Sequence, residues 1–185
     1  MSDPLNSPAV VALDDAAHRV AVALRGRPLL DRTFYALSEA ANHSLLWHAI
    51  NAADALTGGP AARRRALRRS VIIATEQALV NGPVKFAVKR KRPTALATHP
   101  YRLRSPRTSS FPSGHASAGA CAATLLTKDL GRGPLWWSLA GLVAWSRVHV
   151  GVHHASDVVG GLVLGRTLAG VAGRVWPGPN RAARR

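Results

Sequence analysis

A run of ionisable side chains set between apolar segments is the feature that most constrains what this chain can fold into. Residues 146–157 read Ser-Arg-Val-His-Val-Gly-Val-His-His-Ala-Ser-Asp, and the segments 135–145 and 158–175 on either side are mostly apolar or glycine. Burying an uncompensated charge is costly, so polar groups placed here must pair with one another or hold a ligand. The fold has to supply partners for them.

Three interpretations of this polar segment are open from its residues alone. His149, His153 and Asp157 are four residues apart in turn, so on a continuous helix they would share one face and could begin a metal site. Alternatively, Arg147 holds an anion, His153 is a nucleophile or base, and Asp157 fixes the tautomer of that histidine. The third interpretation is a solvated turn between two helices.

The composition favours lipid over nucleic acid as a partner. The 185 residues suffice for one domain, and they combine a formal net charge of +16 with 47% hydrophobic residues. Aromatic residues for base stacking are scarce around the densest basic block, residues 85–93, which argues against a nucleic-acid partner. Cys121 is the only cysteine, which excludes an intrachain disulfide and a cysteine zinc site. The N-terminus lacks a signal-peptide pattern.

Helical patterns fill most of the chain. Residues 8–24 predict an amphipathic helix that is too polar in the middle to cross a bilayer easily. Residues 31–56 predict one membrane helix with a polar side. A third helix opens on the arginines of residues 63–69 and bends at Gly82-Pro83. Three apolar, glycine-rich segments close the chain, namely 116–126, 135–145 and 158–175.

These patterns predict an all-α, polytopic membrane bundle of about five to six helices. Residues 1–60 supply the amphipathic helix and one membrane helix, residues 61–176 form the core that carries the polar clusters, and residues 177–185 form a basic, disordered tail. The arginines of residues 63–69 mark the cytoplasmic edge by the positive-inside rule. The polar clusters at the other ends of the helices would then face the extracytoplasmic side.

A second polar cluster, residues 111–115, stands at the start of an apolar helix. Ser113 offers a hydroxyl group, Gly114 allows close approach of the backbone, and a helix N-terminus directs free N–H groups toward an anion. His115 lies beside this expected phosphate site. A third cluster, residues 85–93, adds the cations of Lys85 and Arg92, and the order of helical hairpins brings all three clusters to one end of the bundle.

The three clusters together resemble the type-2 phosphatidic acid phosphatase superfamily, which also includes the vanadium haloperoxidases and bacterial acid phosphatases. The superfamily pattern is Lys, six residues, Arg-Pro; then Pro-Ser-Gly-His; then Ser-Arg, five residues, His, three residues, Asp. The resemblance covers about residues 63 to 172. The matching positions are Lys85, Arg92, Pro93, Pro112, Ser113, Gly114, His115, Ser146, Arg147, His153 and Asp157.

The resemblance implies a four-helix phosphatase core and a role for each matched residue. His153 would attack phosphorus and form a phosphohistidine, Asp157 would orient it, and His115 would act as general acid and then general base. The residues implied to bind the phosphoryl oxygens are Lys85, Arg92, Ser113, Gly114 and Arg147. The resemblance implies no metal and no cofactor. His149 and His154 lie outside the pattern, and we expect them to serve local packing or the polarity of the site's mouth.

The function expected from this resemblance is hydrolysis of a lipid phosphate by a multi-pass protein of the cell membrane. Candidate substrates are phosphatidate, a polyprenyl phosphate or diphosphate, and a prenyl-linked sugar phosphate. The alternatives within the superfamily are a vanadate-dependent haloperoxidase and a soluble type of acid phosphatase. A protein that binds anionic lipid without turnover is the non-enzymatic alternative, against which the complete pair of histidines argues.

Overall fold

The computed structural model describes residues 4–93 and 108–178, and every regular element within these ranges is helical. The all-α prediction is therefore confirmed. The short helix α5 (Lys85–Ala87) follows a five-residue π-helical segment, Val80–Val84. The longer helices are α1 (Pro8–Leu24), α2 (Pro28–Ala40), α3 (Leu45–Thr57), α4 (Gly59–Leu79), α6 (Gly114–Leu130), α7 (Gly133–His149) and α8 (Ala155–Val175).

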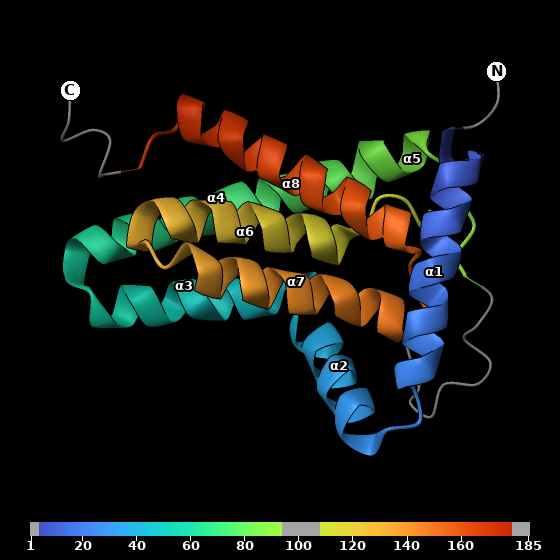
Figure 1. The fold of residues 1–185 in the computed structure, drawn as a ribbon. Helices are drawn as coiled ribbons and strands as arrows, with labels where there is room; N and C mark the ends of the chain where they lie inside the picture. Colours follow the sequence, from blue (N-terminus) through green and yellow to red (C-terminus); the bar gives the residue numbers. More distant parts are fainter. Residues whose placement is uncertain (1–3, 94–107, 179–185) are drawn as a thin grey trace.

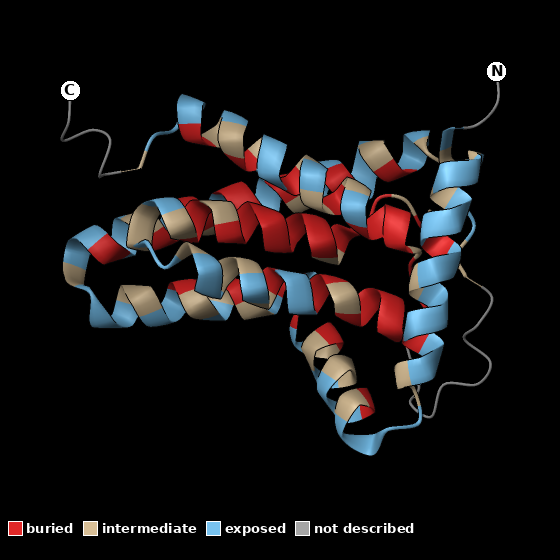
Figure 2. Cartoon of the chain, viewed as in Figure 1, coloured by how far each residue is buried: buried red, intermediate tan, exposed pale blue. Residues whose placement is uncertain are grey.

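Helix α6 lies at the centre of the bundle (Figure 1), where it packs against α8, α7 and α4. All its residues from Gly114 to Leu126 are buried except His115 and Thr124, which are partly buried (Figure 2). Most of these side chains are small, so the neighbouring helices can approach closely without leaving cavities. The apolar segments predicted at 116–126, 135–145 and 158–175 are the middles of α6, α7 and α8, each extended by flanking residues.

Two glycines of α8 set its distance from α6. A Cβ atom at Gly161 would lie 2.5 Å from the Ser113 carbonyl oxygen, and one at Gly165 would overlap the Ser117 carbonyl. Only glycine allows the two backbones to come this close. The first turns of α6 and α8 are thereby held side by side, and both turns carry residues of the superfamily pattern.

The prediction of one continuous helix over residues 31–56 is wrong. Helix α2 ends at Ala40, a 3₁₀ turn over Asn42–Ser44 follows, and α3 begins at Leu45. His43 and Ser44 have φ angles of 52° and 62°, which break the helical path. The Asn42 side chain bonds to Glu39 and His115 instead of facing lipid, and such polar side chains compete with helix formation. The break predicted at Gly82-Pro83 is confirmed by the π-helical segment Val80–Val84.

Helix α1 spans the predicted residues and lies across the end of the bundle, packed against α7 and α8 (Figure 1). The segment after it is tied to α7, because Arg25 donates from Nε to the His149 carbonyl at 2.7 Å and from Nη2 to the Val148 carbonyl at 3.2 Å. A cation at the C-terminus of a helix also offsets the helix dipole. Among the described residues, α8 is the one helix long and apolar enough by itself to cross a bilayer.

A network of ion pairs joins the helices at the opposite end of the bundle. Arg68 and Arg69 belong to the arginine cluster of residues 63–69, and both are buried. Arg69 contacts Asp54 at 2.5 Å and Asp129 at 3.1 Å, and Arg68 contacts Asp129 at 3.1 Å. Because each buried cation has an anionic partner, this end of α4 packs against α3 and α6 without an isolated charge.

Candidate active site

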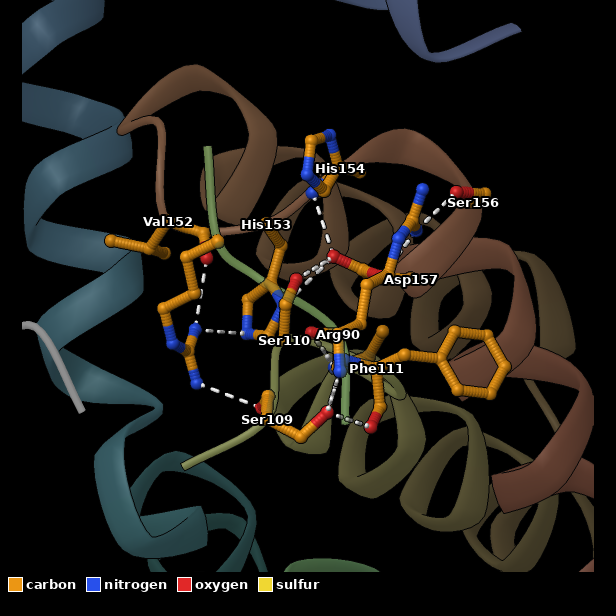
Figure 3. Close-up of polar contacts among 12 residues, drawn as sticks. Arg90, Ser109, Ser110, Phe111, Val152, His153, His154, Ser156 and Asp157 are labelled. Carbon is orange, nitrogen blue, oxygen red and sulfur yellow. Dashed lines mark hydrogen bonds and ion pairs between the residues drawn. The ribbon is translucent and has the colours of Figure 1, made fainter. Parts of the chain in front are cut away.

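The three polar clusters meet at the end of the bundle where α6 and α8 begin and α7 ends (Figures 1 and 3). Helix α7 stops at His149, and Gly151, with a φ of 75°, turns the chain back toward the bundle. His153 follows in this turn and α8 begins at Ala155. The segment that follows α5 and the segment that precedes α6 lie together at the same end of the bundle. A hydrogen bond joins them, from the Ser110 N–H to the Arg90 carbonyl at 2.9 Å.

His153 lies between a carboxylate and a guanidinium group. Its Nδ1 is 3.5 Å from Asp157 Oδ2, and its Nε2 is 3.3 Å from Arg92 Nη1. Arg92 is held in place by carbonyl groups, with Nη1 donating to Val152 at 2.9 Å and Nη2 to Ser109 at 3.1 Å. The imidazole therefore presents one nitrogen to an anion and the other to a cation.

Burial keeps His153 neutral. Only 4% of the residue is exposed. This burial is the main cause that lowers the pKa of His153 to about 4; the contact with Asp157 opposes the shift, and the charges of Arg147 and Arg92 add to it. At neutral pH the imidazole thus has a lone pair available for attack.

The Asp157 carboxylate is fixed by several donors from different segments. Its Oδ2 accepts the His154 N–H at 2.8 Å and a short hydrogen bond from the Ser110 hydroxyl, and its Oδ1 accepts Arg90 Nη1 at 2.6 Å. The bond to His154 is half of a capping box, because Asp157 is the third residue of α8. The residue that faces His153 therefore also fixes the start of α8.

Ser113 and Gly114 form the start of α6. The Ser113 hydroxyl caps the helix by accepting the Ala116 N–H at 3.5 Å, and the Ser113 N–H donates to the Asp157 carbonyl at 2.9 Å. A Cβ at Gly114 would lie 2.8 Å from Asn81 Oδ1, so the glycine allows the π-helical segment to pack against α6. The first turn of α6 is thus tied to the first turn of α8.

His115 and Arg147 share a partner on α2. His115 Nε2 lies 3.2 Å from the Ser38 carbonyl and 3.1 Å from Asn42 Oδ1, while Arg147 Nη1 makes a short hydrogen bond to the Ser38 hydroxyl. The Ser38 carbonyl therefore positions His115, the expected general acid, and the Ser38 hydroxyl positions Arg147, one of the expected phosphate ligands. Both contacts come from the part of the chain that carries no residue of the pattern.

Lys85 and Arg92 line a cavity of about 980 Å³ beside this end of the bundle, and Lys89 and Lys91 line it as well. Lys85 is buried, and this burial, followed by the positive charges of Arg92 and Arg147, lowers the pKa of the lysine to about 8. Lys85, Arg92 and Arg147 therefore stand close enough to repel one another. An anion in the cavity would relieve the repulsion.

The geometry of a metal site over His149, His153 and Asp157 is not present. The break between α7 and α8 separates the three residues, and His149 Nε2 instead bonds to Asp31 Oδ1 of α2 at 2.8 Å. The Phe34 ring packs against the same imidazole. Across residues 4–93 and 108–178, no three histidine, cysteine or acidic side chains are grouped as a metal would require.

Several residues of the site were not predicted from the sequence. Arg90 lies inside the cluster of residues 85–93 but outside the fixed positions of the superfamily pattern, and no motif marks the other residues. Only the high density of cations in residues 85–93 could have drawn attention to Arg90. The residues that the sequence did not indicate are Asp14, Ser38, Asn42, Arg90 and Ser110.

Comparison with known sequences settles the family. The profile of the PAP2 superfamily matches residues 66–180. The chain belongs to the PAP2 superfamily. The phosphatase is 34% identical over 166 residues to the decaprenylphosphoryl-5-phosphoribose phosphatase of Mycobacterium tuberculosis, across 88% of this chain and 90% of the relative. It is 36% identical over 117 residues to the undecaprenyl-diphosphatase of Sulfolobus acidocaldarius, across 58% of this chain and 54% of that relative.

Solved structures give the same fold. The transmembrane PAP2-type phosphatidylglycerolphosphate phosphatase of Bacillus subtilis superposes with a TM-score of 0.70 at 27% identity, over 92% of this chain and 88% of that one. LpxE of Aquifex aeolicus superposes with a TM-score of 0.68 at 21% identity, over 85% and 92%. The family resemblance stated from the motifs is confirmed, and the phosphatase is a membrane enzyme that acts on lipid phosphates.

Proposed function

We propose that the phosphatase removes the terminal phosphate of a polyprenyl-linked substrate in two displacements on His153. In the first, the Nε2 lone pair attacks phosphorus, the bond from phosphorus to the leaving oxygen breaks, and His115 protonates that oxygen. In the second, His115 takes a proton from water, the water oxygen attacks phosphorus, and the bond to Nε2 breaks. Inorganic phosphate leaves and both imidazoles return to their starting state.

The placement of His153 carries this proposal. A neutral, buried imidazole with Nδ1 facing Asp157 and Nε2 facing Arg92 is arranged for attack on an anion held by that guanidinium. Asp157 stabilises the proton on Nδ1 as positive charge develops on the ring. The 3.5 Å gap between Nδ1 and Oδ2 is long for a hydrogen bond, and we expect it to shorten when a phosphate binds.

The charge of the cavity supports a substrate with a second phosphate near the lipid. Lys85, Arg92 and Arg147 are enough to hold one phosphoryl group. Lys89 and Lys91 line the same cavity, and neither has an ion pair with an acid in the part of the chain that the structure describes. A diphosphate or a phosphodiester would place its additional negative charge beside them. The names of the relatives, a decaprenylphosphoryl phosphatase and an undecaprenyl-diphosphatase, agree with such a substrate.

We further propose that the helices cross the membrane several times and that the site faces the extracytoplasmic side. Support comes from the exposed cations at the opposite end of the bundle, which the positive-inside rule assigns to the cytoplasm. They are Arg63, Arg64, Lys128, Arg132 and Arg174. The test is Arg132→Cys in a Cys121→Ala background. A membrane-impermeant thiol reagent should label it only in opened cells, and labelling in intact cells would reverse the orientation.

The experiment for the reaction is phosphate release in detergent from a polyprenyl phosphate, a polyprenyl diphosphate and phosphatidate, with and without EDTA. The variants are His153→Ala and, as a matched control, His48→Ala on α3. Release that survives EDTA, vanishes in His153→Ala and persists in His48→Ala is the expected result. Substrate labelled in its terminal phosphate should also leave acid-labile label on wild type and none on His153→Ala. Turnover by His153→Ala, or loss of turnover in EDTA, would overturn the proposal.

A further inference from the structure

We propose that Arg90 and Asp14 are positioning residues that hold Asp157 against His153, so that the N-terminal helix α1 completes the active site. The inference rests on the histidine mechanism proposed above. It concerns two residues outside the superfamily pattern, one of them in a helix that carries no motif. Their role would be to act through Asp157 without touching the phosphate.

Arg90 bridges two carboxylates. Its Nη1 donates to Asp157 Oδ1 at 2.6 Å and to Ser156 Oγ at 2.7 Å, as Figure 3 shows, and its Nη2 donates to Asp14 Oδ2 at 2.8 Å. The Arg90 side chain is 13% exposed, that of Asp14 8% and that of Asp157 0%. Ion pairs with this geometry and this little contact with water are far less screened than surface pairs.

Asp14 is locked onto the first turn of α8. Its Oδ1 accepts the Ser156 N–H at 2.8 Å, and its Oδ2 accepts the Ser156 hydroxyl at 2.8 Å. An anion at a helix N-terminus is stabilised by the free N–H groups there. Asp14 therefore fixes one side of Arg90 relative to Ser156, the residue directly before Asp157.

Asp157 needs this support because both its oxygens must keep their places. Its Oδ2 faces His153 Nδ1 and also accepts bonds from Ser110 and the His154 N–H, while Arg90 holds Oδ1. With Oδ1 released, the carboxylate could rotate about its Cβ–Cγ bond and carry Oδ2 away from Nδ1. The imidazole would then lose the orientation that directs Nε2 at phosphorus.

The same contacts would arise if Arg90 only anchored α1 to the bundle, and kcat, KM and Tm measured together separate the two roles. Loss of an anchor alone lowers the Tm but leaves the kcat of the folded enzyme unchanged. Loss of a positioning residue lowers kcat while KM stays nearly constant, because Asp157 no longer directs His153 at the bound substrate.

The experiment compares Arg90→Gln, Arg90→Lys and Asp14→Asn with two controls on the exposed surface of α1, Asp15→Asn and Arg19→Gln. With a polyprenyl phosphate as substrate, Arg90→Gln should lower kcat by about 10- to 100-fold, with KM changed by less than about twofold. Asp14→Asn should lower kcat by about 3- to 10-fold, because Arg90 keeps its bond to Asp157 but loses one support. Arg90→Lys should recover part of the loss, and the controls should match wild type.

The double variant Asp14→Asn/Arg90→Gln should be no slower than Arg90→Gln alone, because Asp14 acts through Arg90. Equal kcat for Asp14→Asn and Asp15→Asn, or a kcat of Arg90→Gln equal to that of wild type with only the Tm lowered, would overturn the inference. If Arg90→Gln does not fold, Asp14→Asn and Arg90→Lys still decide it. Turnover by His153→Ala would refute the proposed histidine mechanism. If His153→Ala is inactive while the Arg90 and Asp14 variants are fully active, the histidine mechanism stands and only the positioning role is refuted.

Discussion

Replacing Gly161 with alanine should damage both the stability and the activity of the phosphatase. The new Cβ would lie 2.5 Å from the Ser113 carbonyl oxygen and 3.1 Å from Ala116 Cβ. A separation of at least 3.0 Å is needed, so α6 and α8 must move apart by on the order of 0.5 Å or more at the turn where they meet. This turn carries the bond from the Ser113 N–H to the Asp157 carbonyl, so the displacement reaches the site directly.

The expected cost follows from that displacement. Overpacking of this kind destabilises by about 1–3 kcal/mol, which in a chain of this length corresponds to a Tm lower by about 2–12 °C. A shift on the order of 1 Å between catalytic groups can lower kcat by about 100-fold, so we expect a loss of about 10- to 100-fold. The assay is thermal unfolding in detergent together with phosphate release from a polyprenyl phosphate.

Gly170→Ala is the matched control for this variant. It changes the same residue type on the same helix, but its Cβ would meet nothing within 4 Å. Alanine there should raise the stability by about 0.4–1 kcal/mol and leave kcat unchanged, because alanine favours the helix. If Gly161→Ala behaves like Gly170→Ala in both assays, close contact between α6 and α8 does not set the geometry of the site.

The remaining predictions concern pH, charge and the second buried histidine. Because the pKa of His153 is lowered to about 4, kcat/KM should fall as the pH drops through about 4 and the imidazole becomes protonated. Because the pKa of Lys85 is lowered to about 8, kcat/KM should also fall as the pH rises through about 8 and the lysine loses its charge. In Lys85→Arg this alkaline limb of the pH profile should disappear. The double variant Lys89→Gln/Lys91→Gln should raise KM for a polyprenyl diphosphate by about tenfold and change KM for the monophosphate much less. A tenfold change is the size expected when two exposed ion pairs of about 0.7 kcal/mol each are lost. His149→Ala should destabilise by about 1–3 kcal/mol in thermal unfolding, because Asp31 Oδ1 loses its buried partner and only Oδ2 keeps its bond to the Gly26 N–H. The kcat should stay within about threefold of wild type, and a loss of kcat equal to that of His153→Ala would contradict the assignment of His149 to packing.

The amino-acid sequence determined the elements whose causes are local. The bounds of α1, the break at Gly82-Pro83 and the three closing helices follow from apolar spacing, proline and glycine within a few residues. The spacing of the three motifs was also sufficient to indicate the family, because the chain fills every fixed position of the superfamily pattern in order. Ser113 as the cap of α6 follows from the same local rules.

Only the tertiary structure decided which distant groups support that site. Asp14 contacts Ser156, 142 residues later in the chain, and Ser38 contacts Arg147, 109 residues later. Nothing in the periodicity around residues 14 or 38 distinguishes these side chains from ordinary polar positions on a helix. The turn at His43 and Ser44, which the pattern of residues 31–56 did not indicate, lets α2 lie against α7 and brings Ser38 and Asn42 to His115. Such contacts depend on how whole helices pack, and packing is set by the shapes of surfaces that are far apart in the sequence.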